Sequence, residues 1–320
     1  MHNSRIEKQR TLAGSFSLTG KGLHTGMTST VTFLPAAENT GYKIRRVDLP
    51  GEPTIDAIAK NVANTTRSTV LSDKGVEVAT VEHALAALYA NEIDNCLIEV
   101  DAPEFPILDG SSSLYVDKIL STGAVEQNAV REYFTPETTI EYYDEDSGSR
   151  MLLSPSYSLS IHTQISFDSV ILNVQSANLE DITEFNEKFS MCRTFVFVNE
   201  METLIKHGLI KGGDLDNAIV IYDQPLPQSE FDQIAEIMKV EKRDANKLGY
   251  LMNEPLRFKN EPARHKILDI MGDIALTGRF IKGTIISVRP GHKVNNMFAR
   301  KIVEEMEKTN HLQPMEYINI

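Results

Sequence analysis

Hydrophobic residues along this chain follow two periodicities, one typical of helices and one typical of strands. Apolar positions three and four residues apart predict helices over residues 80–90, 112–120, 182–189, 229–242, 264–278 and 294–308. Alternating or β-branched runs predict strands over residues 28–34, 138–143, 151–154, 157–167 and 284–288. Each half mixes strands with helices and ends in strand, loop and helix. We therefore expect an α+β fold of two loosely similar halves, although the letters show no clear repeat.

A mixed, polar stretch at residues 123–136 separates the two halves and ends in a proline. We place a domain boundary there, with an N-terminal α+β domain at 1–125 and a C-terminal α+β domain at 126–320. Residues 195–216 combine a short apolar strand, an amphipathic turn and a Gly-Gly pair. Residues 225–257 add a segment with an amphipathic surface helix at 229–242.

Charge and composition narrow the classes of protein that this chain can be. The net charge is −13, with 45 acidic against 32 basic residues, which opposes nucleic-acid binding. Cys96 and Cys192 lie far apart and form no Cys-x-x-Cys pair, which excludes a zinc site built from cysteines. The polar residues 1–10 are not followed by an apolar h-region, so we expect no secretory signal, and no apolar run approaches the roughly 20 residues that span a bilayer. We expect a cytoplasmic protein without stable membrane insertion.

The predicted helix at 264–278 carries four titratable residues on one stripe. At about 100° per residue, His265, Lys266, Asp269 and Asp273 share one arc, and apolar residues fill the opposite one. An ordinary amphipathic helix with a solvated face gives the same pattern. Alternatively, His265 and Asp269, at i and i+4, bind one metal ion, because imidazole nitrogen and carboxylate oxygen are ordinary zinc donors. A catalytic zinc would then need a third protein ligand from elsewhere.

Two further histidines occupy positions suited to catalysis. His83 follows Glu82 early in a helix that is otherwise rich in alanine and leucine. Either Glu82 complements the helix dipole in the first turn, or it is a base beside a metal ligand. His292 follows the predicted strand at 284–288, in a loop where catalytic groups often lie. It is a candidate general acid, or a cation that faces developing negative charge.

Several short motifs occur in order along nearly the whole chain. They are Gly-Leu-His-Thr-Gly at 22–26, Val-Glu-His at 81–83, Ile-Asp-Asn at 93–95, Ala-Pro-Glu-Phe-Pro-Ile-Leu-Asp-Gly-Ser at 102–111, Arg-Thr-Phe at 193–195, Arg-His-Lys-Ile-Leu-Asp at 264–269, Gly-Asp at 272–273 and Gly-His-Lys-Val-Asn-Asn at 291–296. Each alone is a weak signal, but together they are highly specific. The sequence resembles the UDP-3-O-acyl-N-acetylglucosamine deacetylases, zinc amidases that commit bacteria to lipid A synthesis.

The resemblance implies a zinc ion held by His83, His265 and Asp269, with water in the fourth position. Glu82 would be the general base for that water. The reaction would hydrolyse the N-acetyl group of UDP-3-O-acyl-N-acetylglucosamine, giving acetate and UDP-3-O-acyl-glucosamine.

The resemblance also implies roles for four neighbouring residues. Thr194 would stabilise the tetrahedral oxyanion together with the zinc. His292, oriented by Asp273, would protonate the leaving amine or stabilise the anionic intermediate. Lys266 would contact the substrate or the carboxylate base.

In the fold that the resemblance implies, helices lie between the sheets of two α+β domains, and the site forms at their junction. A βαβ insert, here near 195–216, would form an apolar passage for the acyl chain. The expected substrate contacts are His24, Phe195, Leu209, Gly213 and Lys266. Relatives with a segment like 225–257 include some that are fused to a dehydratase domain, so a dehydratase domain is the expected fusion partner of a longer form.

Two other hypotheses stay open at this point. One is a non-catalytic sugar-nucleotide or lipid-binding protein with the same pocket and no metal. The other is a zinc hydrolase of similar build that acts on another amide. Glu82 separates the first of these from an enzyme, because a binding protein has no use for a carboxylate placed to activate water.

Overall fold

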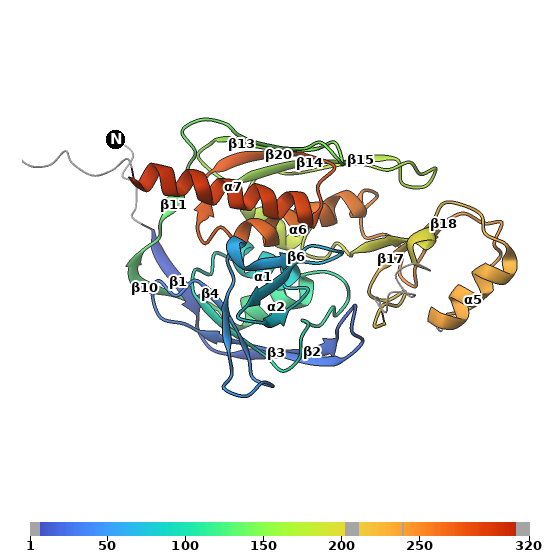
Figure 1. The fold of residues 1–320 in the computed structure, drawn as a ribbon, viewed down its shortest axis with the longest axis horizontal. Helices are drawn as coiled ribbons and strands as arrows, with labels where there is room; N and C mark the ends of the chain where they lie inside the picture. The colour runs from blue at the N-terminus through green and yellow to red at the C-terminus, as the bar shows by residue number, and fades with distance from the viewer. Residues whose placement is uncertain (1–6, 202–210, 239, 312–320) are drawn as a thin grey trace, which may run out of the picture.

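Two five-stranded sheets with the same strand order form the outer layers of the fold (Figure 1). The structure, a computed structural model, describes residues 7–201, 211–238 and 240–311. The first sheet has the order β2-β3-β9-β4-β5, and the second has the order β12-β13-β20-β14-β15. In each sheet the third and fourth strands of this order are parallel, and all other neighbours are antiparallel. The two halves therefore share one topology. This structural repeat is not visible in the amino-acid sequence.

The strands of the first sheet are β2 (Phe16–Lys21), β3 (Thr28–Pro35), β9 (Cys96–Val100), β4 (Tyr42–Arg46) and β5 (Thr54–Asp56). Those of the second are β12 (Ile140–Asp144), β13 (Ser149–Pro155), β20 (Gly283–Val288), β14 (Ser160–Ser166) and β15 (Val174–Leu179). Two pairs stand apart, namely β1 (Lys8–Leu12) with β10 (Ala124–Val130), and β11 (Tyr133–Phe134) with β19 (Phe280–Ile281).

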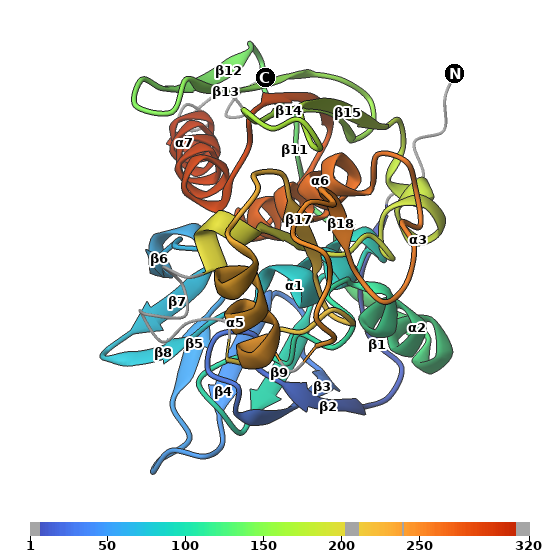
Figure 2. The ribbon, with the colours of Figure 1, turned by 90° about the vertical axis from the view of Figure 1, so that its right-hand side faces the viewer.

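Helices fill the space between the two sheets (Figures 1 and 2). They are α1 (Glu82–Ala90), α2 (Ser113–Thr122), α6 (Glu261–Ala275) and α7 (His292–His311). Helices α1 and α2 flank β9 in the chain, and α6 and α7 flank β20 in the same way. The equivalent helices α1 and α6 pack against each other at the centre. The predicted α+β fold, with helices between the sheets of two similar halves, is confirmed.

Local sequence explains where these helices begin and end. Gly123 follows α2 with a φ of 79°, and its N–H donates to the Ile119 carbonyl, which closes the last turn. Pro262 lies in the first turn of α6, where a missing N–H costs nothing. The predicted helix at 264–278 therefore begins three residues earlier, at Glu261, and ends at Ala275. Short 3₁₀ turns occur at Ala59–Asn61 and Ile182–Glu184, the latter leading into α3 (Phe185–Lys188).

Each half also carries a small three-stranded sheet just before its central helix. The first consists of β6 (Val62–Asn64), β7 (Val70–Asp73) and β8 (Val76–Val78). The second consists of β16 (Phe195–Phe197), β17 (Ile219–Tyr222) and β18 (Gly249–Leu251). Helix α5 (Gln228–Met238) packs on the second small sheet, and this part projects from the body (Figure 1). The surface helix that we predicted at 229–242 corresponds to α5, which begins one residue earlier and is shorter, ending at Met238.

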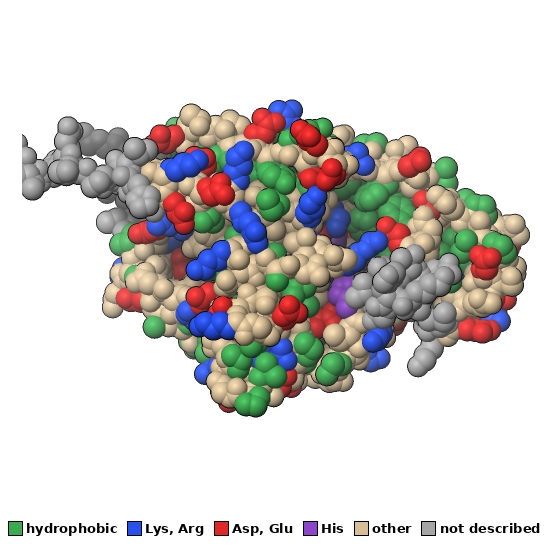
Figure 3. All heavy atoms as spheres, viewed as in Figure 1, with side chains coloured by type: hydrophobic (Ala, Val, Ile, Leu, Met, Phe, Trp, Pro, Cys, Tyr) green, Lys and Arg blue, Asp and Glu red, His purple; other side chains and the backbone are tan. Residues whose placement is uncertain are grey.

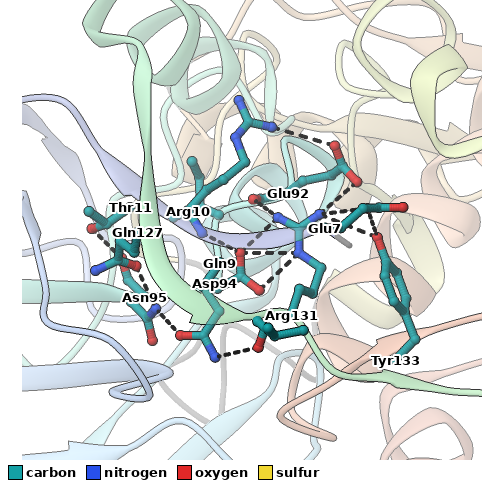
Figure 4. Close-up of polar contacts among 12 residues, drawn as sticks. Glu7, Gln9, Arg10, Thr11, Glu92, Asp94, Asn95, Gln127, Arg131 and Tyr133 are labelled. Carbon is teal, nitrogen blue, oxygen red and sulfur yellow. Dashed lines mark hydrogen bonds and ion pairs between the residues drawn. The ribbon is translucent and has the colours of Figure 1, made fainter. Parts of the chain in front are cut away.

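Arg131 joins the two halves near the β1–β10 pair (Figure 4). Its buried guanidinium donates to Asp94 Oδ2 at 2.7 Å and to Glu92 Oε1 at 2.9 Å. The same group lies 4.6 Å from the ring centroid of Phe280. Residues on both sides of the predicted boundary therefore meet around one buried cation, and a boundary near residue 125 stays a prediction. Within the described ranges, no helix is long and apolar enough to cross a membrane.

Candidate metal centre and active site

Three of the four residues of the titratable stripe of α6 are buried, and the fourth, Lys266, is half-buried. His265 and Asp269 are each 1% exposed, and Asp273 is fully enclosed. An ordinary solvated helix face is therefore excluded. The stripe faces α1, and the two helices approach closely because position 272 is a glycine. A β-carbon there would lie 2.1 Å from the Glu82 carbonyl oxygen, so only glycine fits.

This packing brings three possible metal ligands from both halves together. His83 comes from α1, and His265 and Asp269 come from α6. Asp269 Oδ1 lies 3.3 Å from His265 Nε2 and 4.0 Å from His83 Nε2. The three donor atoms all lie within 4.8 Å of one another. Tetrahedral zinc ligands at about 2 Å from the ion lie about 3.3 Å apart, so this set fits such an ion with small adjustments.

The hydrogen bonds around these side chains also fit a metal ion. Asp269 Oδ1 is buried and has no hydrogen-bond partner among the described residues, while Asp269 Oδ2 accepts from Lys266 Nζ at 2.7 Å. His265 Nδ1 lies 2.9 Å from the Cys192 carbonyl, which can only accept. Nδ1 therefore carries the proton, and Nε2 presents a lone pair to the centre of the cluster.

The protonation states suit metal binding as well. Burial, with the neighbouring His265, lowers the pKa of His83 to about 3, so this imidazole is neutral. Burial alone would raise the pKa of Asp269, but His265 and Lys266 hold it well below its ordinary value. Metal ligands must be deprotonated, and both groups already are at neutral pH.

Glu82 is a buried carboxylate beside this cluster. Its Oε2 accepts the Thr69 N–H at 3.1 Å, and its Oε1 lies 3.6 Å from His292 Nε2. Burial raises the pKa of Glu82 to about 7, partly offset by the charge of His292. A carboxyl group with that pKa can accept and release a proton near neutrality.

His292 is the first residue of α7, so its predicted place in a loop after the strand is wrong. The strand β20 ends at Val288, and only three residues separate it from the helix. His292 Nδ1 lies 3.1 Å from Asp273 Oδ2. Burial alone would lower the pKa of His292, but Asp273, Asp269 and Glu82 together raise it to about 9. The imidazole is therefore a cation at neutral pH in the metal-free protein.

Asp273 is held by three donors that sequence reasoning did not assign. Asn295 donates to Oδ2 at 2.9 Å, Asn296 donates to Oδ1 at 3.0 Å, and the Thr69 hydroxyl donates to Oδ1 at 2.5 Å. The two asparagines belong to the motif at 291–296, which was a usable signal. Thr69 lies just before β7 and carries no such signal.

The turn at 22–26 is held by Glu104, another residue without an assigned role. Its carboxylate accepts the backbone N–H groups of His24 and Thr25 at 2.9 and 2.8 Å. The His24 ring is buried, and neither nitrogen has a hydrogen-bond partner among the described residues. Buried ring nitrogens without a partner make His24 a candidate ligand contact.

A cavity of about 50 Å³ adjoins this turn and has a largely apolar lining. Its lining includes the predicted residues His24, Thr194, Phe195 and Gly213. Lys266 Nζ lies 5.0 Å from the centroid of the Phe195 ring, which links the cavity to the α6 stripe. Leu209, the remaining predicted substrate contact, lies outside the described residues. Figure 3 shows hydrophobic side chains in a hollow between the body and the projecting part.

A larger cavity, of about 490 Å³, lies elsewhere, and none of the predicted site residues that the structure describes lines it. Its lining includes Tyr42, Asp94 and Arg279 and is mixed in charge. Among the residues described there, it brings together neither a possible metal-binding group nor an unpartnered buried side chain, so the smaller cavity is the better candidate.

A buried ion pair positions the segment that carries Thr194. The fully enclosed Arg193 donates through Nε to Glu261 Oε1 at 2.9 Å and through Nη2 to Oε2 at 3.1 Å. Glu261 begins α6, so the pair fixes residues 192–195 beside the metal-ligand helix. The Arg-Thr-Phe motif signalled this arginine, but its partner was not predicted.

Comparison with known proteins gives consistent results. Residues 9–239 and 245–304 match the sequence profile of a family described as UDP-3-O-acyl N-acetylglycosamine deacetylase. A protein from Bacteroides thetaiotaomicron named bifunctional enzyme LpxC/FabZ is 54% identical over 93% of this chain and 65% of its own length. A protein of the same name from Porphyromonas gingivalis is 51% identical over 97% of this chain and 67% of its own length. The chain thus spans about two thirds of these relatives. A UDP-3-O-acyl-N-acetylglucosamine deacetylase from Saccharophagus degradans is 35% identical over 97% of both chains.

Proposed function

Because this chain belongs to the UDP-3-O-acyl N-acetylglycosamine deacetylase family, we propose that it hydrolyses the N-acetyl group of UDP-3-O-acyl-N-acetylglucosamine. Water would add to the acetamide carbonyl, the C–N bond would break, and acetate and UDP-3-O-acyl-glucosamine would leave. This is the committed step of lipid A biosynthesis. The observation that carries the proposal is the buried convergence of His83, His265 and Asp269 beside Glu82.

His83, His265 and Asp269 would hold a zinc ion. Two imidazoles and one carboxylate are a donor set found in catalytic zinc sites. When bound, the ion would polarise the substrate carbonyl and make water more acidic. The unpartnered Asp269 Oδ1 supports this role, since a buried carboxylate oxygen left without a partner is costly.

Glu82 would act as the general base. Its position next to His83 in α1 sets it beside the metal ligands without making it one of them. Its pKa of about 7 leaves it able to take a proton from water and pass it on at neutral pH. The Thr69 N–H fixes one carboxylate oxygen and leaves Oε1 toward His292.

His292 would protonate the leaving amine or stabilise the anionic intermediate, with Asp273 as its positioning residue. The hydrogen bonds that Asp273 accepts from Asn295 and Asn296 keep its carboxylate fixed behind the imidazole. Thr194 would donate its hydroxyl to the developing oxyanion. The segment that carries Thr194 is held in place by Cys192, two residues earlier, whose carbonyl accepts a hydrogen bond from His265 Nδ1.

The substrate would lie along the cavity beside the 22–26 turn. Lys266 would contact it from the α6 stripe, and Phe195, Gly213 and His24 would line its path. Leu209, outside the described residues, keeps its predicted role as an acyl contact. In this proposal the N-terminal domain, 1–125, supplies Glu82 and His83, and the C-terminal domain, 126–320, supplies the other ligands.

We also propose a cytoplasmic location and, in a longer form of the protein, fusion to a dehydratase domain. The names of the relatives from Bacteroides thetaiotaomicron and Porphyromonas gingivalis support the fusion, since both describe bifunctional proteins.

An acetate-release assay on UDP-3-O-acyl-N-acetylglucosamine tests the proposal, run with matched metal analysis of the purified chain. We expect stoichiometric zinc, acetate release, and loss of turnover in chelator that returns on adding zinc. A chain that turns over in excess chelator, or that binds the sugar nucleotide without releasing acetate, would contradict the proposal.

A further inference from the structure

A second apolar cavity lies beneath α5, next to the cavity that adjoins the candidate site. Its volume is about 30 Å³. Met201 and Val220 line both cavities, so among the described residues the two cavities share part of their wall. The remaining lining is mostly hydrophobic and comes from α5, the small sheet and the segments beside them: Val198, Leu215, Phe231, Ile234, Ala235, Val240 and Leu251, with Glu241 and Arg243 at an exposed rim.

The small sheet provides a continuous floor for both cavities. Val196 on β16 pairs with Val220 on β17, and Val220 pairs with Leu251 on β18. Side chains at paired positions point to the same face of a sheet. Val196 lines the cavity near the site, Leu251 lines the one beneath α5, and Val220 lines both. The floor therefore runs across three strands from one cavity into the other.

The opposite face of this sheet is used differently. Phe197, Ile219 and Ile221 point into the main core, whereas Val198 and Val220 belong to a second apolar cluster with Phe231 of α5. Both faces are apolar, as is typical of strands that are buried on both sides. Helix α5 covers the face that carries Val220. Ala235 is the small residue on the buried side of α5, and its size leaves the space beneath the helix open.

The chemistry of this second cavity selects a hydrocarbon. None of the described residues that line it has a buried side-chain nitrogen or oxygen without a hydrogen-bond partner. An apolar lining of this kind favours apolar groups over polar ones. Met201, which separates it from the first cavity, is unbranched and can change rotamer at low cost.

We propose that the cavity beneath α5 holds the distal end of an acyl chain whose proximal part lies beside Thr194 and Phe195, with Met201 as the movable wall between the two. The inference rests on the proposed function, and it makes α5 a determinant of acyl-chain length. The occupant is the continuation of the substrate, because the floor from Val196 to Leu251 is unbroken.

Turnover of UDP-3-O-acyl-N-acetylglucosamine with acyl chains of about ten to eighteen carbons tests the inference, since each buried methylene favours binding about fourfold. In the wild type, kcat/KM should rise with chain length until the second cavity is filled. Ala235→Phe fills that cavity, so the rise should stop about three carbons earlier, with short substrates unaffected. Gln233→Phe adds the same ring on the exposed side of α5 and should leave the profile unchanged.

A binding measurement separates this inference from the proposed function. A hexadecanoic acid with a terminal trifluoromethyl group reports by ¹⁹F NMR whether its tip is buried. We expect a shifted resonance with the wild type and with Gln233→Phe, and loss of that shift with Ala235→Phe. If no substrate releases acetate but this pattern holds, the proposed function fails and the cavity assignment stands.

Identical length profiles and identical ¹⁹F shifts in all three proteins would overturn the inference. Thermal unfolding checks that Ala235→Phe is folded. If the phenylalanine variant is not folded, Ala235→Leu replaces it in both measurements. Leucine adds less volume, so the same change in the length profile and in the ¹⁹F shift should be smaller.

Discussion

Gly272 of α6 lies against the backbone carbonyl of Glu82 at the start of α1, so closely that a β-carbon at 272 would come within 2.1 Å of that oxygen. We expect Gly272→Ala to separate the two helices, to lower the free energy of unfolding by about 1–3 kcal/mol and to weaken metal binding. Denaturant unfolding and metal titration measure both effects. Gly14→Ala is the control, because a β-carbon there meets Thr122 at an ordinary 3.7 Å. Equal unfolding free energies and equal metal affinities in the two variants would show that the Gly272–Glu82 contact does not set the spacing of the helices.

Removing the carboxylate of Glu82 should separate catalysis from metal binding. We expect Glu82→Gln to keep stoichiometric metal and to lose about 10²- to 10⁴-fold in kcat, because it removes the base and no ligand. Elemental analysis and acetate release give the two readouts. Loss of metal in proportion to activity would mean that Glu82 is a ligand.

His265→Ala should have the opposite pattern. It removes a ligand and leaves Asp269 Oδ1 with one imidazole instead of two, so we expect loss of bound metal. Added zinc should raise the Tm of the chelator-treated wild type and not that of the variant, because only a protein that binds the ion is stabilised by it. A comparable Tm rise in the variant would place the metal elsewhere.

The charge on His292 should appear as a pH-dependent stability in metal-free protein. Its pKa is raised from about 6.5 to about 9 by carboxylates, chiefly Asp273, after burial is offset. A raised pKa means that the stabilisation is complete below pH 6.5 and is lost as the pH rises through 9. The stability advantage of the wild type over His292→Gln, measured in chelator, should therefore shrink between these values. A constant difference would show that the imidazole is neutral throughout.

The Arg131 cluster should matter for stability more than surface ion pairs do. Asp94→Ala leaves a buried guanidinium without its main partner, which we expect to cost about 3 kcal/mol. Glu141→Ala removes the partner of Arg150 in a pair in which both side chains are about half exposed, and it should cost less than about 1 kcal/mol. Similar losses in urea unfolding would mean that the remaining partners, Glu92 and Glu7, are enough to stabilise the Arg131 guanidinium.

Much of the local structure could be predicted from periodicity, but the pairing of distant segments could not. The helices around His83 and His265 follow from apolar spacing, because that signal lies within one segment. The shared topology of the two sheets depends on partners far apart in the chain. Ser112 shows the same limit: it is the N-cap residue of α2, yet its hydroxyl donates to the His83 carbonyl at 2.8 Å and makes no capping bond to its own helix.

The candidate site was predictable to a similar degree. Its titratable residues lie within short motifs, and those motifs singled them out. The residues that hold them in place, such as Thr69 and Glu261, act through contacts between segments and have ordinary surroundings in the sequence. The start of α7 at His292 was missed because the apolar spacing begins two residues later, at Val294.

The division of the ligands between α1 and α6 has a thermodynamic consequence. A bound ion would connect the two halves of the molecule, so metal binding and the packing of α1 against α6 are thermodynamically coupled. Metal binding would favour the packing of the helices by the same factor by which that packing favours metal binding. The dissociation constant of the metal would then depend on the distance between α1 and α6. Any change that alters that spacing, however far from the ligands, should be readable in the metal affinity before it is visible in the overall fold.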